Sequence, residues 1–179
     1  IKQIEPYSPW QNDAESAIRE LKRGSGRKMV RAGAPKPLWA DCIEFEAYVQ
    51  SHTAWDIYKL REETPQTVMS GETADISPFC KLSFYEWVMY REDSKVVQYP
   101  DENPALGRYL GVAIDVGPAM TAKILKANGQ VVYRSTYRGL TEKEVNNAAH
   151  IAQREEFDAG IAEKWGADCM PEDFPDVAL

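Results

Sequence analysis

The apolar residues of this chain change their spacing once, and that change restricts the folds that the chain can adopt. Up to Gly71 they recur every three or four residues, a spacing that predicts amphipathic helices. After a polar linker at residues 71–78 they alternate with polar residues in short runs, which is typical of strands. Helices followed by a series of strands predict an α+β protein.

The helical half contains signals for the ends of three helices. The first runs from about Asp13 to Lys22, and Gly24-Ser25-Gly26 predicts a break after it. A second runs from near Pro37, a residue suited to a first helical turn, to about His52. A third is short, with Thr64 as its N-cap and Gly71 as its stop.

Four β-rich runs follow, separated by residues that favour turns. They cover residues 82–90, 107–116, 121–125 and 131–137. Asn128-Gly129 lies between the last two runs and predicts a tight hairpin, because a two-residue turn needs positive φ at both positions. Four or five short antiparallel strands predict a small SH3-like barrel or a curled sheet.

Other local signals concern the core and the C-terminal segment. We expect four large aromatic residues to lie in the core, with base stacking as the alternative for Trp87: Trp39, Trp55, Trp87 and Tyr90. Cys42 and Cys80 are expected to behave as small hydrophobic residues. Thr141 begins a capping-box pattern that predicts a helix running to about Lys164.

The net charge of −7 is unevenly distributed along the chain. Residues 141–179 contain ten acids and three bases, which is −7, so the remainder carries no net charge. Between Arg19 and Lys36 there are seven bases and a single acid, Glu20. A local basic stripe of this kind is a footprint of phosphate binding, even in a chain that is acidic overall.

The basic stripe directly follows an extended segment that leads into the first helix. Two prolines hold residues 6–10 extended, and Asn12 or Asp13 can cap the helix. Glu15 then lies in the first turn, with Arg19 and Lys22 on the same face. The simpler interpretation is an exposed acid that the helix dipole favours, beside solvated cations.

This segment, Tyr7-Ser8-Pro9-Trp10-Gln11-Asn12 followed by Glu15, resembles the end of the catalytic core of copia-type retrotransposon integrases. The similarity covers roughly residues 3–140 and continues in order through four short motifs: Leu38-Trp39-Ala40, Thr64-Pro65, Tyr109-Leu110-Gly111 and Val132-Tyr133-Arg134-Ser135. One departure is that Asp13-Ala14 makes the loop before Glu15 one residue shorter than is usual in the family.

The resemblance implies a site and a set of partners. Glu15 would be the third carboxylate of an Asp-Asp-Glu site that holds two Mg²⁺ ions in the intact enzyme, with both aspartates upstream. DNA would be the main partner, the intact integrase would form a homo-oligomer, and it would act in the nucleus after a cytoplasmic particle stage. The DNA-contacting residues would be Gln11, Asn12, Arg19, Lys22, Arg23, Arg27 and Lys28.

The same resemblance implies a division of the chain. Residues 1–72 would be the closing helices of an RNase H-like core, and residues 73–80 a linker. Residues 81–140 would form the SH3-like barrel, and residues 141–179 an acidic, partly helical tail. The chain would then be a fragment that is inactive alone, because it lacks the two aspartates.

Bulk composition agrees with a protein that is neither secreted nor inserted in a membrane. No apolar run approaches the roughly 20 residues of a membrane span. The three cysteines are odd in number and widely separated, which fits a reducing compartment. Two other interpretations remain open: a non-catalytic module that binds nucleic acid or protein, and a decayed element copy without function.

Overall fold

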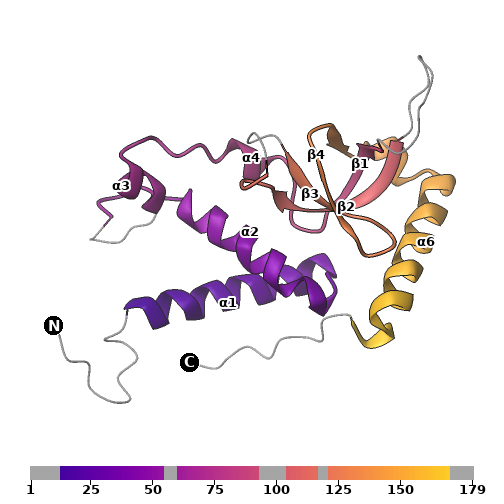
Figure 1. Ribbon diagram of the computed structural model, residues 1–179, viewed down its shortest axis with the longest axis horizontal. Helices are drawn as coiled ribbons and strands as arrows, with labels where there is room; N and C mark the ends of the chain where they lie inside the picture. The colour runs from indigo at the N-terminus through magenta and orange to yellow at the C-terminus, as the bar shows by residue number, and fades with distance from the viewer. Residues whose placement is uncertain (1–12, 55–59, 93–103, 117–120, 170–179) are drawn as a thin grey trace.

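The computed structural model describes residues 13–54, 60–92, 104–116 and 121–169, and it has the α+β class predicted from the sequence. Helices form the N-terminal half and a five-stranded sheet follows, with further helices at the C-terminal side (Figure 1). The N-terminal helices are α1 (Asp13–Ala32), η2 (Lys36–Leu38), α2 (Trp39–Ser51), α3 (Pro65–Ser70) and α4 (Ser77–Cys80). The strands and later helices are β1 (Trp87–Arg91), β2 (Pro104–Val112), β3 (Ala122–Leu125), β4 (Val131–Arg134), β5 (Tyr137–Gly139), α5 (Glu142–Val145), α6 (Ala148–Trp165) and η3 (Ala167–Cys169).

Helix α1 is continuous through Gly24-Ser25-Gly26, so the predicted break after Lys22 is wrong. The reason is a close contact with α2. A Cβ atom at Gly24 would lie 2.6 Å from Glu46 Oε1. Ser25 is buried, its hydroxyl donates to the Leu21 carbonyl at 2.7 Å, and its own carbonyl accepts from the Cys42 thiol at 3.4 Å. The small residues therefore allow helix–helix packing rather than a hinge.

The short helix α3 has the predicted ends. The Thr64 hydroxyl accepts from the Thr67 amide at 3.0 Å, and Gly71 has a left-handed conformation with φ 74°. Helix α2 also matches its prediction, apart from the single turn of η2 before it.

A single hydrophobic cluster joins α1 and α2 to the sheet and to α6. Phe45 of α2 contacts Phe84, with ring centroids 5.8 Å apart, and meets Tyr109 of β2 edge to face at 6.4 Å. Phe157 of α6 packs edge to face on Trp87 of β1 at 5.1 Å. The sheet therefore packs against helices that precede it in the sequence, α1 and α2, and against one that follows it, α6.

The sheet has the order β4-β3-β2-β1-β5, and all of its pairs are antiparallel. Its outer strands, β4 and β5, are joined by Ser135 and Thr136 alone. In a flat sheet four strand spacings would separate them by about 19 Å, whereas three Cα–Cα steps span about 11 Å at most. The sheet must therefore curl, and Arg134 Nε donates to the Arg91 carbonyl at 3.2 Å across the resulting gap.

The predicted turn at Asn128-Gly129 is present, but it is one residue longer than expected. Gly129 has φ 72° and donates to the Lys126 carbonyl at 2.8 Å, while Asn128 is not among the residues with positive φ. Asn128 Oδ1 instead accepts from the Gln130 amide at 3.0 Å. A left-handed residue after a two-residue turn is the usual form of a three-residue hairpin loop.

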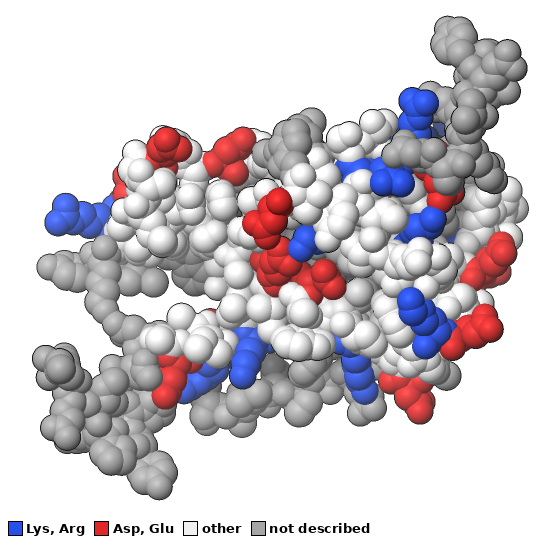
Figure 2. Space-filling model, in the orientation of Figure 1, with Lys and Arg blue, Asp and Glu red and all other residues white. Residues whose placement is uncertain are grey.

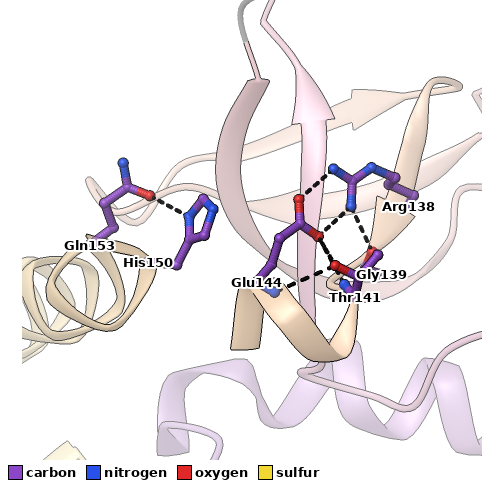
Figure 3. A network of polar contacts seen from close by, with 6 residues as sticks. All are labelled: Arg138, Gly139, Thr141, Glu144, His150 and Gln153. Carbon is purple, nitrogen blue, oxygen red and sulfur yellow. Dashed lines mark hydrogen bonds and ion pairs between the residues drawn. The ribbon is translucent and has the colours of Figure 1, made fainter. Parts of the chain in front are cut away.

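The capping box at Thr141 is confirmed, but its helix ends at Val145 (Figure 3). Asn147 then caps α6, its Oδ1 accepting from the Ala149 amide at 2.9 Å. The predicted single helix to Lys164 is therefore two helices, because a second side-chain cap competes with continuation of the first.

The aromatic and cysteine predictions are only partly correct. Tyr90 is buried and Trp87 is half-buried, but Trp39 is 60% exposed. Trp39 lies roughly a quarter turn from the side of α2 that buries Cys42 and Phe45. Cys80 is exposed, at the end of the short helix α4, whereas Cys42 is buried. Trp55 lies outside the described residues.

Within the described part of the chain, no helix combines the length and the apolar character needed to cross a bilayer.

Candidate nucleic-acid interface

One face of α1 displays an acid and two cations together. Glu15, Arg19 and Lys22 are exposed, and because the helix is continuous, Arg19 and Lys22 lie within about 40° of Glu15 around its axis. Ile18 beside them is 52% exposed. Figure 2 shows Lys and Arg side chains along the edge of the molecule where α1 runs. This face combines a carboxylate with the charge needed to contact phosphates.

The other predicted cations of α1 turn away from Glu15. Arg23 lies about 80° and Arg27 about 120° around the helix, and Lys28 lies about 140° away in the opposite direction. Lys28 Nζ pairs with Glu46 at 3.0 Å and lies 4.7 Å from the centre of the Phe45 ring. The structure therefore brings Arg19 and Lys22 to Glu15 and separates Arg27 and Lys28 from it. Gln11 and Asn12 lie outside the described residues.

The described residues do not by themselves form a metal site. They contain no group of three or more His, Cys, Asp or Glu side chains that could hold an ion. Glu15 supplies a single carboxylate, fewer ligands than a two-metal site needs.

A second basic region was not predicted. A cleft of about 840 Å³ lies between α1, α2 and the segment before β1. Its lining includes five cations and two acids: Arg27, Lys28, Arg31, Lys81, Arg108, Glu46 and Glu86. Arg27 and Arg31 are four residues apart, so the sequence alone predicts that they share one face of α1, which is one wall of the cleft. Lys81 and Arg108 join them only through the fold.

Arg108 is the most enclosed cation of this cleft. Its guanidinium lies 3.3 Å from the centre of the Trp87 ring and 4.3 Å from that of Tyr85. Nη1 donates to the Tyr85 carbonyl at 3.1 Å, and Nη2 to Asp158 at 3.2 Å. Burial lowers the pKa of Arg108, while Tyr85 and Asp158 act against that shift. Arg108 thus fastens α6 to the sheet at the wall of the cleft.

Another face of the molecule carries charges of both signs. Figure 2 shows acidic side chains gathered near the centre of the view, over the region where α2 meets the sheet. Glu44 of α2 pairs with Lys123 of β3, and Lys123 also acts electrostatically on Asp41. Burial raises the pKa of Asp41 against the effect of Lys123. These charges join α2 to the sheet and offer no basic patch to a phosphate backbone.

Comparisons with known proteins add no identification, because no family model, no curated protein and no solved structure matches the chain.

Proposed function

We propose that this chain is the C-terminal part of a copia-type retrotransposon integrase, whose intact form inserts element DNA into target DNA. The observation that carries the proposal is the exposed face of α1, which presents Glu15 in the first helical turn together with Arg19 and Lys22. In the integrase motif that residues 7–15 resemble, the last acid of the site lies on the helix that follows the motif. Glu15 has this position in α1.

The fold supports the same proposal at two further points. Helices α1 and α2 pack closely, as closing helices of an RNase H-like core would. The strands that come first and last in the sequence, β1 and β5, are paired, and the sheet curls, as the strands of a small SH3-like barrel would.

In the intact enzyme, Glu15 would join two upstream aspartates in holding two Mg²⁺ ions. These ions would supply the Lewis acid for a metal-dependent transesterification. Arg19, Lys22 and Arg23 would hold the DNA backbone, with Gln11 and Asn12 in the segment before the helix. Arg27 and Lys28 would contribute less, since they face away from Glu15. Homo-oligomer formation and action in the nucleus belong to this proposal.

The test of the proposal is the sequence immediately upstream in the parent gene. Two aspartates should be present, the second about 35 residues before Glu15 in the usual family spacing. Stop codons there would favour the decayed copy, and an unrelated upstream domain would favour the interaction module.

The interaction module is a second candidate because of the cleft behind α1. A cleft that combines cations with an apolar floor can bind a ligand without any catalytic group.

A further inference from the structure

The cleft lies on the side of α1 that faces away from Glu15. Gly24 and Arg31 line it, and both lie about 160° to 180° around the helix from Glu15. A ligand in this cleft and DNA on the Glu15 face would therefore contact different sides of one helix. The occupant of the cleft is a separate question from the integrase proposal.

The walls and the floor of the cleft define the chemistry of its ligand. Arg27, Arg31 and Lys81 are exposed at its walls. Lys28 and Arg108 are less exposed and pair with Glu46 and Asp158. The floor includes buried and half-buried aromatic rings: Phe45, Phe79, Phe84, Tyr85 and Trp87. A ligand that fits carries a few negative charges and at least one apolar or aromatic group.

The two acids in the lining favour a peptide over a nucleic acid. Glu46 and Glu86 are held in the lining, Glu46 by Lys28 and Glu86 by the Ser83 amide, and a phosphate backbone in the cleft would pass near both. A peptide can place its carboxylates opposite the cations and neutral residues opposite the two acids.

The chain itself contains such a peptide. Residues 170–179 read Met-Pro-Glu-Asp-Phe-Pro-Asp-Val-Ala-Leu, with three acids, no base and one aromatic residue. They lie outside the described residues, but their point of attachment is described. Cys169 is 5% exposed, and its thiol acts electrostatically on Tyr85 in the lining of the cleft.

This attachment places the segment within reach of the cleft. Four extended residues beyond Cys169 cover about 13 Å. A short tether also gives the segment an effective concentration on the order of millimolar, so weak contacts suffice for binding. The two prolines restrict the free segment and lower the entropy lost when it binds.

We propose that the cleft binds residues 170–179 of the same chain, with the acids Glu172, Asp173 and Asp176 facing Arg31 and Lys81, and Phe174 on the aromatic floor. Bound in this way, the segment neutralises part of the basic stripe and limits access of other anions to one side of α1.

The test measures binding of a labelled peptide of residues 168–179 to the full-length chain by fluorescence anisotropy. The host variant Glu172→Gln/Asp173→Asn/Phe174→Ala/Asp176→Asn should bind the peptide at least tenfold more tightly than the unmodified chain, because its own segment no longer competes. A matched control is Glu155→Gln/Glu156→Gln/Glu163→Gln, which removes three exposed acids of α6 and should bind the peptide as the unmodified chain does.

A charge swap tests the placement of the segment. In the host variant, Arg31→Glu/Lys81→Glu should reduce binding of the peptide at least tenfold, and a peptide with Glu172→Lys/Asp173→Lys should restore it. Rescue also shows that the swapped chain is folded. Equal binding by the unmodified chain and the host variant would overturn the proposal, as would a swap without effect.

Two further outcomes would assign the cleft to another occupant. A duplex oligonucleotide that displaces the peptide from the host variant, and loses this ability in Arg31→Glu/Lys81→Glu, would assign the cleft to nucleic acid. Hydrogen exchange at residues 79–87 that slows with increasing concentration of the unmodified chain would assign it to a second copy. Either result overturns the proposal and leaves the role of Glu15, Arg19 and Lys22 untouched.

Discussion

Gly24 of α1 faces Glu46 of α2 so closely that a Cβ atom at Gly24 would lie 2.6 Å from the Glu46 carboxylate. The carboxylate is held there by Lys28 Nζ at 3.0 Å and by Gln50 Nε2 at 3.0 Å. The missing side chain of Gly24 therefore leaves room for an ion pair that ties the two helices together.

Gly24→Ala should stabilise the chain only when Glu46 is replaced. In a helix interior the substitution gains about 0.5 to 1 kcal/mol from backbone entropy. With Glu46 present, displacement of the carboxylate should cancel or reverse that gain, whereas in a Glu46→Ala background the full gain should appear. Urea unfolding of the four chains of this double-mutant cycle gives the coupling. The same stabilisation in both backgrounds would show that the close contact carries no energy.

Glu15→Gln should separate a catalytic role from a structural one in the intact parent protein. Removing the charge at a helix start costs about 0.3 to 1 kcal/mol of stability through the helix dipole. Loss of a metal ligand should instead lower strand transfer by orders of magnitude while DNA binding persists. The measurements are strand transfer with an oligonucleotide substrate and urea unfolding of the same preparation. Strand transfer near the parental rate would show that another acid completes the site.

Arg19→Ala and Lys22→Ala should weaken binding of duplex DNA of any sequence. Each should lower the slope of log affinity against log salt by about one unit, because each removes one phosphate contact. Lys28→Ala is the matched control: it removes the same charge from α1, but the cation it removes is already paired with Glu46. Its slope should fall by clearly less than one unit, while its thermal stability falls because the ion pair is lost. An equal slope change in all three would mean that only the total charge of α1 matters.

Glu144→Gln should destabilise the chain at neutral pH and lose its effect in acid. Arg138 and the Thr141 amide and hydroxyl hold the pKa of Glu144 well below its ordinary value of 4.5 (Figure 3). Because the folded state lowers this pKa, the stabilisation is complete above pH 4.5 and is lost as pH falls below it. Urea midpoints of both chains between pH 7 and pH 3 measure this. A difference that persists unchanged at pH 3 would show that the carboxylate charge is not involved.

The sequence predicted the ends of helices correctly where the capping residue acts on its near neighbours in the chain. Thr64, Gly71 and Thr141 act on amides within three or four residues, so no knowledge of the rest of the fold is needed. Gly24-Ser25-Gly26 led to the wrong prediction of a helix break. These small residues allow close packing against α2, and that contact is between segments distant in the sequence.

The basic cleft could not be predicted for the same reason. Arg31 is visible in the sequence as part of a basic stripe, but Lys81 and Arg108 join it only when the sheet packs on α2. The acidity of residues 141–179 likewise gave no sign that α6 would bury Phe157 and Ile161.

The pairing of β1 with β5 has a consequence for how this architecture can be assembled. Val88 lies opposite Gly139 in that ladder, so the sheet begins and ends at one place. Neighbouring strands are only about 4.8 Å apart. A chain entering at Val88 and leaving at Gly139 therefore makes almost no net displacement, although β2, β3 and β4 lie between them in the sequence. The helical segments before and after the sheet start from neighbouring points, which lets Phe45 and Phe157 share one core with it.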